Sequence, residues 1–134
     1  MKITTSLAIN LIFLPFLTEA ALVINMREPK ITGRKAVIKL DMENTFSKKL
    51  EGAKGTIFLM DDGGNVVSQA SRWIIGGAKN RPSLGSEDKA NYYFVVPAAK
   101  PFSKTRLMID RVVLEGGKLA NPVKDVIVKE ANSK

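Results

Sequence analysis

Apolar and polar residues alternate along much of the chain with a period of two, which differs from the period of about 3.6 expected for a helix. The clearest stretch is residues 36–43, where Ala36, Ile38, Leu40 and Met42 alternate with mostly polar neighbours. Successive side chains of a strand point to opposite faces of its sheet. This stretch is therefore predicted to form a strand with one buried face.

Similar stretches predict strands along the rest of the chain. The expected strands are residues 22–26, 36–43, 54–60, 65–75, 92–96 and 105–114, and a last strand made by Leu119 and residues 123–128. Asp61-Asp62-Gly63-Gly64 is typical of a tight turn, so residues 54–75 are predicted to form a hairpin. The alternation of residues 105–114 breaks at Asp110 and Arg111, which predicts a bulge. About seven strands separated by turns predict an all-β, immunoglobulin-like antiparallel β-sandwich over residues 21–134.

Residues 1–20 have the three-part layout of a secretory signal peptide. Lys2 supplies a positive start, residues 7–17 (LAINLIFLPFL) form an apolar run, and residues 18–20 place small side chains before a cut after Ala20. The run is shorter than the roughly 20 residues that a membrane span needs. We therefore expect an exported protein, periplasmic or secreted, with no membrane span after cleavage. Two alternatives stay open: cleavage one residue later, and an uncleaved anchor extended by residues 21–24.

The composition argues against catalysis. The chain has no Cys and no His, so it lacks thiolate nucleophiles and the side chain best suited to proton transfer near neutral pH. The acidic turn at residues 61–65 lacks the alternating ligands and the later Glu of an EF-hand calcium loop. Neighbouring carboxylates such as Asp61 and Asp62 would point apart on an extended backbone. We expect no enzymatic activity, no cofactor and no metal.

The charge is strongly basic but is spread over the chain. There are 21 basic and 13 acidic residues, a net charge of +8 that the loss of Lys2 and Glu19 with the signal leaves unchanged. Such a balance favours anionic partners, whereas scattered charges are also typical of a solvated surface. An anionic envelope polymer or glycan is therefore one possible ligand. Export separates the protein from most nucleic acid, so nucleic acid is not an expected partner.

Part of the chain resembles the FxLYD family of bacterial immunoglobulin-like domains. The resemblance is carried by residues 41–45 (DMENT), 57–61 (IFLMD), 64–67 (GNVV) and 84–87 (LGSE), followed by Phe94. Ile57 and Met60 stand where that family has its Phe and Tyr. The resemblance implies an immunoglobulin-like sandwich in an exported or envelope protein, and it implies no catalytic residues.

One region is the best candidate for a binding site. Arg72 and Trp73 lie near the end of a predicted strand, and Lys79 and Arg81 lie in the loop beyond it. A strand Trp is usually packed between the sheets of a sandwich, and the alternative is a surface platform for a sugar or base. We expect a non-catalytic module that binds another envelope or extracellular protein through a sheet face or edge. A basic surface for an anionic polymer or glycan is the alternative, and the oligomeric state is left open.

Overall fold

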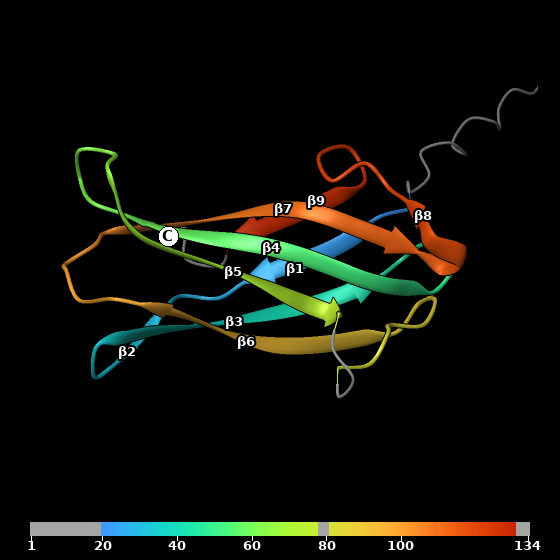
Figure 1. Ribbon diagram of the computed structural model, residues 1–134, viewed down its shortest axis with the longest axis horizontal. Helices are drawn as coiled ribbons and strands as arrows, with labels where there is room; N and C mark the ends of the chain where they lie inside the picture. The colour runs from blue at the N-terminus through green and yellow to red at the C-terminus, as the bar shows by residue number, and fades with distance from the viewer. Residues whose placement is uncertain (1–19, 78–80, 131–134) are drawn as a thin grey trace, which may run out of the picture.

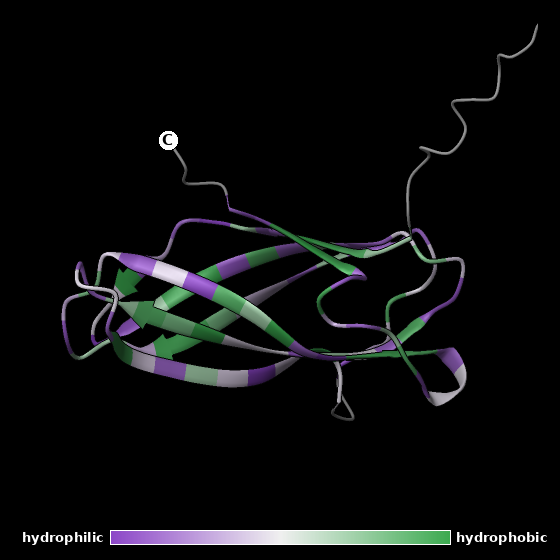
Figure 2. Ribbon diagram, turned by 90° about the horizontal axis from the view of Figure 1, so that it is seen from above, coloured by the Kyte–Doolittle hydropathy of each residue, from purple (hydrophilic) through white to green (hydrophobic). Residues whose placement is uncertain are grey.

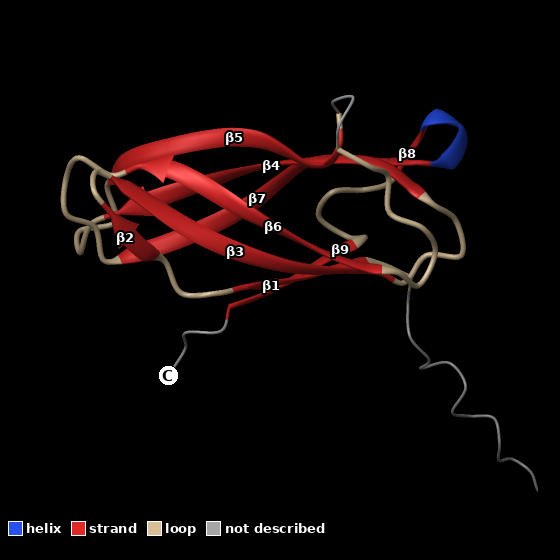
Figure 3. Cartoon of the chain, turned by 90° about the horizontal axis from the view of Figure 1, so that it is seen from below, coloured by secondary structure: helices blue, strands red, loops and turns tan. Residues whose placement is uncertain are grey.

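The computed structural model describes residues 20–77 and 81–130, and these fold into two stacked sheets (Figure 1). Within the described residues the one helical element is a 3-10 turn, η2 (Glu115–Gly117), which Figure 3 shows in blue. The strands are β1 (Leu22–Met26), β2 (Lys30–Thr32), β3 (Lys35–Asn44), β4 (Leu50–Met60), β5 (Val66–Gly76), β6 (Lys89–Pro97), β7 (Lys104–Leu114), β8 (Lys118–Leu119) and β9 (Val126–Glu130). Seven strands have five residues or more, as predicted, and β2 and β8 are short additions.

The first sheet is built around β3. The strand β6 pairs with one side of β3 in antiparallel register, with Ile38 opposite Phe94. On the other side, β2 and β1 pair antiparallel with successive parts of β3. The last strand, β9, then lies parallel to β1, with Ile24 opposite Val128. We call this five-stranded sheet, β6, β3, β2, β1 and β9, sheet A.

The second sheet contains the predicted hairpin. It has the order β5-β4-β7-β8, and we call it sheet B. The hairpin β4–β5 turns at residues 61–65, where the amide of Asp61 donates to the carbonyl oxygen of Asn65 at 2.9 Å. The predicted bulge is confirmed, because Lys54 pairs with Arg111 while Gly55 pairs with Ile109, leaving Asp110 unpaired. All strand pairs of this sheet are antiparallel.

The core lies between the two sheets. The alternation predicted for residues 36–43 is confirmed, since Ala36, Ile38, Leu40 and Met42 are all buried. Leu22, Ile24, Phe94 and Val96 of sheet A extend this buried face, and the fully buried Ile57, Leu59 and Val112 come from sheet B. Figure 2 shows the resulting alternation as bands of apolar and polar residues along the strands. Burial of these side chains is the main term that stabilises the sandwich.

The prediction of one last strand from Leu119 and residues 123–128 is wrong. The segment is divided into β8, which pairs with β7 in sheet B, and β9, which pairs with β1 in sheet A. The break is a turn at residues 121–125, where Asn121 Oδ1 accepts hydrogen bonds from the amides of Val123 and Lys124, each at 2.9 Å. Pro122 has no amide to donate to a strand, so the chain leaves sheet B here.

The amino-terminal prediction concerns residues that are not described. The signal peptide expected over residues 1–20 lies outside the described part of the chain, except for Ala20. In the residues that the structure does describe, no helix has the length and apolar character that a membrane crossing requires.

Candidate functional site

The structure describes three of the four residues of the predicted site at the end of β5. Arg72 is exposed and its Nη1 donates to the carbonyl oxygen of Ser71 at 2.9 Å. Arg81 lies over the ring of Tyr92, 5.3 Å from its centroid, and Lys79 lies outside the described residues. No hydrogen bond or ion pair between Arg72, Trp73 and Arg81 is found in the described chain.

Trp73 lies on the outer face of sheet B instead of in the core. A bulge lets Ala53 pair with Ile75 while Lys54 pairs with Trp73, so Ile74 is the extra residue. Cross-strand partners share a face, and Ala53 is buried while Lys54 is half-buried. The indole is therefore outside, over Gly52, with Lys54 Nζ 5.9 Å from the ring. Half-buried against its own sheet, Trp73 is neither the expected core residue nor an open stacking platform.

A groove runs along the unpaired edge of β7. Within the described residues β8 pairs with β7 at Val113 and Leu114, and the amide of Ala120 donates to the carbonyl oxygen of Val112 at 3.0 Å. Residues 104–111 therefore have no neighbouring strand on that side in the described chain. The strand β9, which follows β8 in the chain, belongs to sheet A (Figure 1). Between β7 and β9 lies a groove of about 500 Å³. Its lining residues are Phe58, Met60, Val66, Arg106, Leu107, Met108, Ile109, Pro122, Val123, Val126 and Val128. We call this the β7 groove.

The lining of the β7 groove is almost entirely apolar. Arg106 is its one charged residue, and the exposed fractions of Val66, Met108 and Val123 are 49%, 49% and 84%. Isolated exposed apolar residues are ordinary, whereas several around one hollow make it a candidate contact surface. Sequence reasoning missed these residues. One signal was available, since Met108 occupies an outward position between the buried Leu107 and Ile109.

A second hollow continues the β7 groove toward the other end of the strand. It shares Met60 and Arg106 with the groove and has a volume of about 530 Å³. Its other lining residues are Pro29, Phe102, Ser103, Lys104, Thr105 and Glu130. In the described residues neither Lys104 nor Arg106 has a carboxylate within ion-pair distance. The edge of β7 therefore combines an apolar groove with two unpaired cations.

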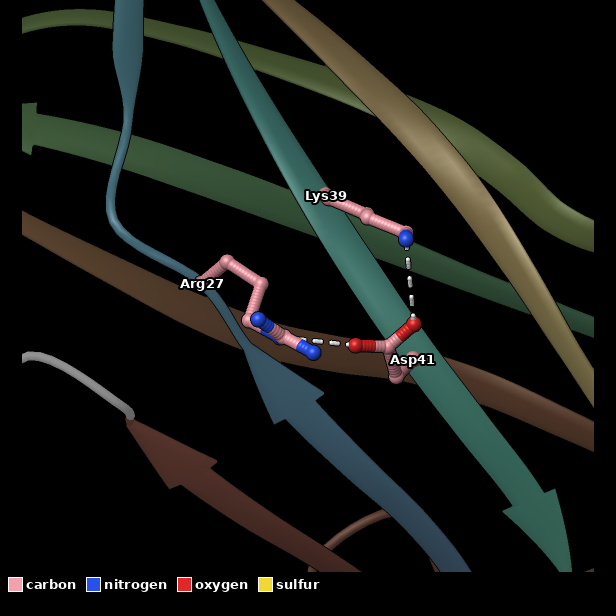
Figure 4. Close-up of polar contacts among 3 residues, drawn as sticks. All are labelled: Arg27, Lys39 and Asp41. Carbon is pink, nitrogen blue, oxygen red and sulfur yellow. Dashed lines mark hydrogen bonds and ion pairs between the residues drawn. The ribbon is translucent and has the colours of Figure 1, made fainter.

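The outer face of sheet A is polar and partly self-neutralised. Asp41 on β3 lies between Arg27 and Lys39, with Arg27 Nε 2.7 Å and Lys39 Nζ 3.9 Å from its carboxylate oxygens (Figure 4). Lys39 Nζ also lies 5.8 Å from the centroid of the Tyr93 ring, and Tyr93 is 58% exposed. Two cations of this face are thus already held by one carboxylate, which reduces what they offer to an anionic ligand.

The turn at residues 61–65 is organised by Asp61. Its Oδ1 accepts hydrogen bonds from the amides of Gly63 at 3.0 Å and Asn65 at 2.9 Å. The bond from the Asn65 amide, above all, lowers the pKa of Asp61 from its ordinary value of 3.8, because it stabilises the ionised form. The described residues contain no cluster of three or more acidic side chains that could hold a metal. The carboxylate therefore serves the hairpin turn.

The stability of the hairpin should depend on pH through Asp61. Because the pKa of Asp61 is lower in the folded state, its ionised form stabilises the fold above about pH 4, and this contribution is lost as pH falls through the lowered pKa. We expect Asp61→Asn to be less stable than the wild type near neutral pH, with a difference that shrinks under acid conditions. Urea unfolding across pH 2–7, with Asp62→Asn as control, measures this; a pH-independent difference would contradict it.

Comparisons with known proteins bear on the fold. No family model matches the chain, and no curated protein matches it. Among solved structures, IrmA from Escherichia coli superposes with a TM-score of 0.58 at 10% identity, over 87% of this chain and 95% of its own. A Bordetella pertussis protein assigned as ApaA superposes with a TM-score of 0.52 at 16% identity, over 75% of this chain and 85% of its own. At such identities the likeness extends to the β-rich architecture alone, and this chain shares that architecture.

Proposed function

We propose that the chain is an exported, non-catalytic immunoglobulin-like module that binds another protein, in the cell envelope or outside the cell. Its contact surface in this proposal is the β7 groove. The observation that carries the proposal is the combination, along one strand, of an unpaired backbone edge and an apolar hollow of about 500 Å³. Signal-like residues 1–20 support export.

Two physical arguments favour a protein partner. Within the described residues, the amides and carbonyls of residues 104–111 that point away from β4 have no partner strand, and such groups recruit another backbone to a sheet edge. Exposed apolar side chains such as Met108 and Val123 lose contact with water when a partner covers them, which favours association. A catalytic role has no comparable support, because the groove is lined by apolar side chains and a single arginine.

Site-specific photocrosslinking in the cells that make the protein tests the proposal. A benzophenone side chain at Val123, in the β7 groove, should give one discrete adduct with a protein. The same group at Tyr93, on the outer face of sheet A, is the control position and should give none. Fractionation with sequencing of the mature amino terminus, done on the same cells, tests the export expectation separately.

Met108→Lys should abolish the adduct at Val123, because removing an ammonium group from water into an apolar contact costs free energy. We expect the adduct yield to fall at least about tenfold, as for removal of a central contact residue. Ile31→Lys is the matched control, since Ile31 is an exposed apolar residue outside the groove, with 58% of its surface accessible. An adduct that survives Met108→Lys would refute the β7 groove as the contact surface.

A second candidate function, binding of an anionic polymer or glycan, is favoured by one observation. Tyr93 offers an exposed ring beside Lys39 in a hollow of about 290 Å³, which Arg27, Glu28 and Lys30 also line. A sugar could stack on the ring while Lys30, which is not held by Asp41, meets an acidic group. Binding to heparin in this case should fall with salt and be lost in Tyr93→Ala. Affinity that does not change between low and high salt excludes it.

A further inference from the structure

We propose that the β7 groove receives an extended segment of a different polypeptide, added as a strand along β7. The segment carries apolar side chains at alternate positions and a carboxylate that meets Arg106. This inference rests on the proposed function and specifies the partner's chemistry.

The backbone argument comes from the path of the carboxyl-terminal strands. β8 pairs with β7 at two positions, and the chain then turns at residues 121–125 and pairs with β1. Among the described strands, none pairs with this side of β7 along residues 104–111, although β4 and β5 continue the sheet on the other side of β7. A polypeptide strand supplies the alternating donors and acceptors that this edge lacks, which a lipid or a small apolar ligand does not.

The side chains argue for an alternating apolar sequence in the partner. Along β7, Leu107 and Ile109 are buried while Arg106 and Met108 are exposed, so both faces of the strand edge contribute to the lining. Val126 and Val128 of β9 close the opposite wall. A strand added to β7 places every second side chain toward this wall. Those positions favour apolar residues, because the wall offers them no polar partner.

The charges specify an acidic partner and disfavour a second copy of the chain. Arg106 and Lys104 have no carboxylate within ion-pair distance among the described residues. Two acidic groups nearby are engaged elsewhere: Asp110 accepts from Thr56 Oγ1 at 2.8 Å, and Asp125 accepts from the Asn121 amide at 2.8 Å. Glu130 lines the second hollow with both cations but lies outside ion-pair distance of them. A second copy would carry its own charge of +8 to this basic edge. Cations on a sheet edge also disfavour pairing with neutral or basic strands. An acidic segment is therefore preferred over other strands.

Selection from a peptide library tests the inference even while the partner is unidentified. The residue 21–134 domain is immobilised and a library of random 12-residue peptides is selected on it. The enriched peptides should alternate apolar and polar residues and contain Asp or Glu. Synthetic versions of the best binders are then measured by titration calorimetry on the wild type, Arg106→Glu, Arg111→Glu and Met108→Lys. Both arginines are exposed residues of β7, but Arg111 does not line the groove.

Arg106→Glu should weaken binding about tenfold, as expected when attraction between close charges becomes repulsion, whereas Arg111→Glu should change it less than about twofold. Hydrogen exchange should slow on peptide binding at those amides of residues 104–111 that point away from β4, because a new strand bonds to them. Circular dichroism confirms that each variant is folded.

The outcomes separate this inference from the proposed function. Strand addition is overturned if Met108→Lys abolishes peptide binding but the wild-type β7 amides exchange at the same rate with and without peptide, or if the peptides bind as helices. The groove then remains the contact surface. The assignment of a partner carboxylate to Arg106 is overturned if the enriched peptides are basic, or if they bind the wild type and Arg106→Glu with equal affinity. Peptides whose affinity is unchanged by Met108→Lys contradict both proposals.

Discussion

Asn44→Asp should lower the free energy of unfolding by about 3–5 kcal/mol, because it removes the donor of several buried hydrogen bonds at once. The side chain of Asn44 is completely buried at the end of β3. Its Nδ2 donates to the carbonyl oxygens of Lys48, Leu84 and Gly85, at 2.9, 3.1 and 3.0 Å. Aspartate has nearly the same shape but places a second oxygen against these three acceptors.

The size of the effect follows from what Asn44 connects. Its Oδ1 accepts from the amide of Phe46 at 2.9 Å, which shapes the connection from β3 to β4. The same side chain holds Leu84, whose backbone exchanges two hydrogen bonds with Leu50 at the start of β4. One amide group thus ties a strand of sheet A to the start of a strand of sheet B. A buried polar group that loses its partners retains the full cost of its desolvation.

Urea unfolding measures this prediction, with Asn44→Ala and Asn91→Ala beside Asn44→Asp. Asn44→Ala removes the same hydrogen bonds without adding charge and should also be strongly destabilising. Asn91 is exposed, so Asn91→Ala should change stability by less than about 0.5 kcal/mol. Compared with the wild type at the same pH, Asn44→Asp should recover part of its stability in acid, where a protonated carboxyl can donate one bond. A loss below about 1 kcal/mol in both Asn44 variants would contradict the assigned role.

Gly76→Ala should lower the free energy of unfolding by about 2–4 kcal/mol, through steric overlap and an unfavourable backbone conformation. Gly76 is buried at the end of β5 with φ of +59°, and a Cβ there would overlap the carbonyl oxygen of Glu51 on β4. Its amide donates to the carbonyl oxygen of Pro82 at 3.1 Å, so the backbone has little freedom to move away.

Gly64→Ala separates the two contributions. Gly64 has φ of +84°, and a Cβ there meets nothing within 4 Å. The control variant therefore suffers the conformational cost alone, about 1 kcal/mol. Thermal unfolding and urea unfolding of both variants should show the larger loss for Gly76→Ala. Equal losses would mean that β4 and β5 adjust to the added methyl group without cost.

Several structural features could be predicted from the sequence because they depend on local patterns. Alternation along residues 36–43 identified the buried face of β3, and the acidic glycine turn identified the β4–β5 hairpin. The broken alternation at Asp110 indicated the bulge in β7. The immunoglobulin-like sandwich follows from these patterns, because strands with one apolar face stabilise one another by stacking. Each of these inferences needs only the chemistry of neighbouring residues.

Tertiary structure alone decided the partners of each strand. Alternation shows which face of a strand is buried but not which edge it joins, so the division of the last segment between β8 and β9 was not predicted. The β7 groove depends on that division, because it lies where the chain leaves sheet B after β8 and β9 joins sheet A. The outer position of Trp73 depends on a bulge, and the role of Asn44 depends on loops far along the chain. The sequence determined the fold class, most of the strands and the buried face of β3, whereas the candidate site arises from long-range pairing.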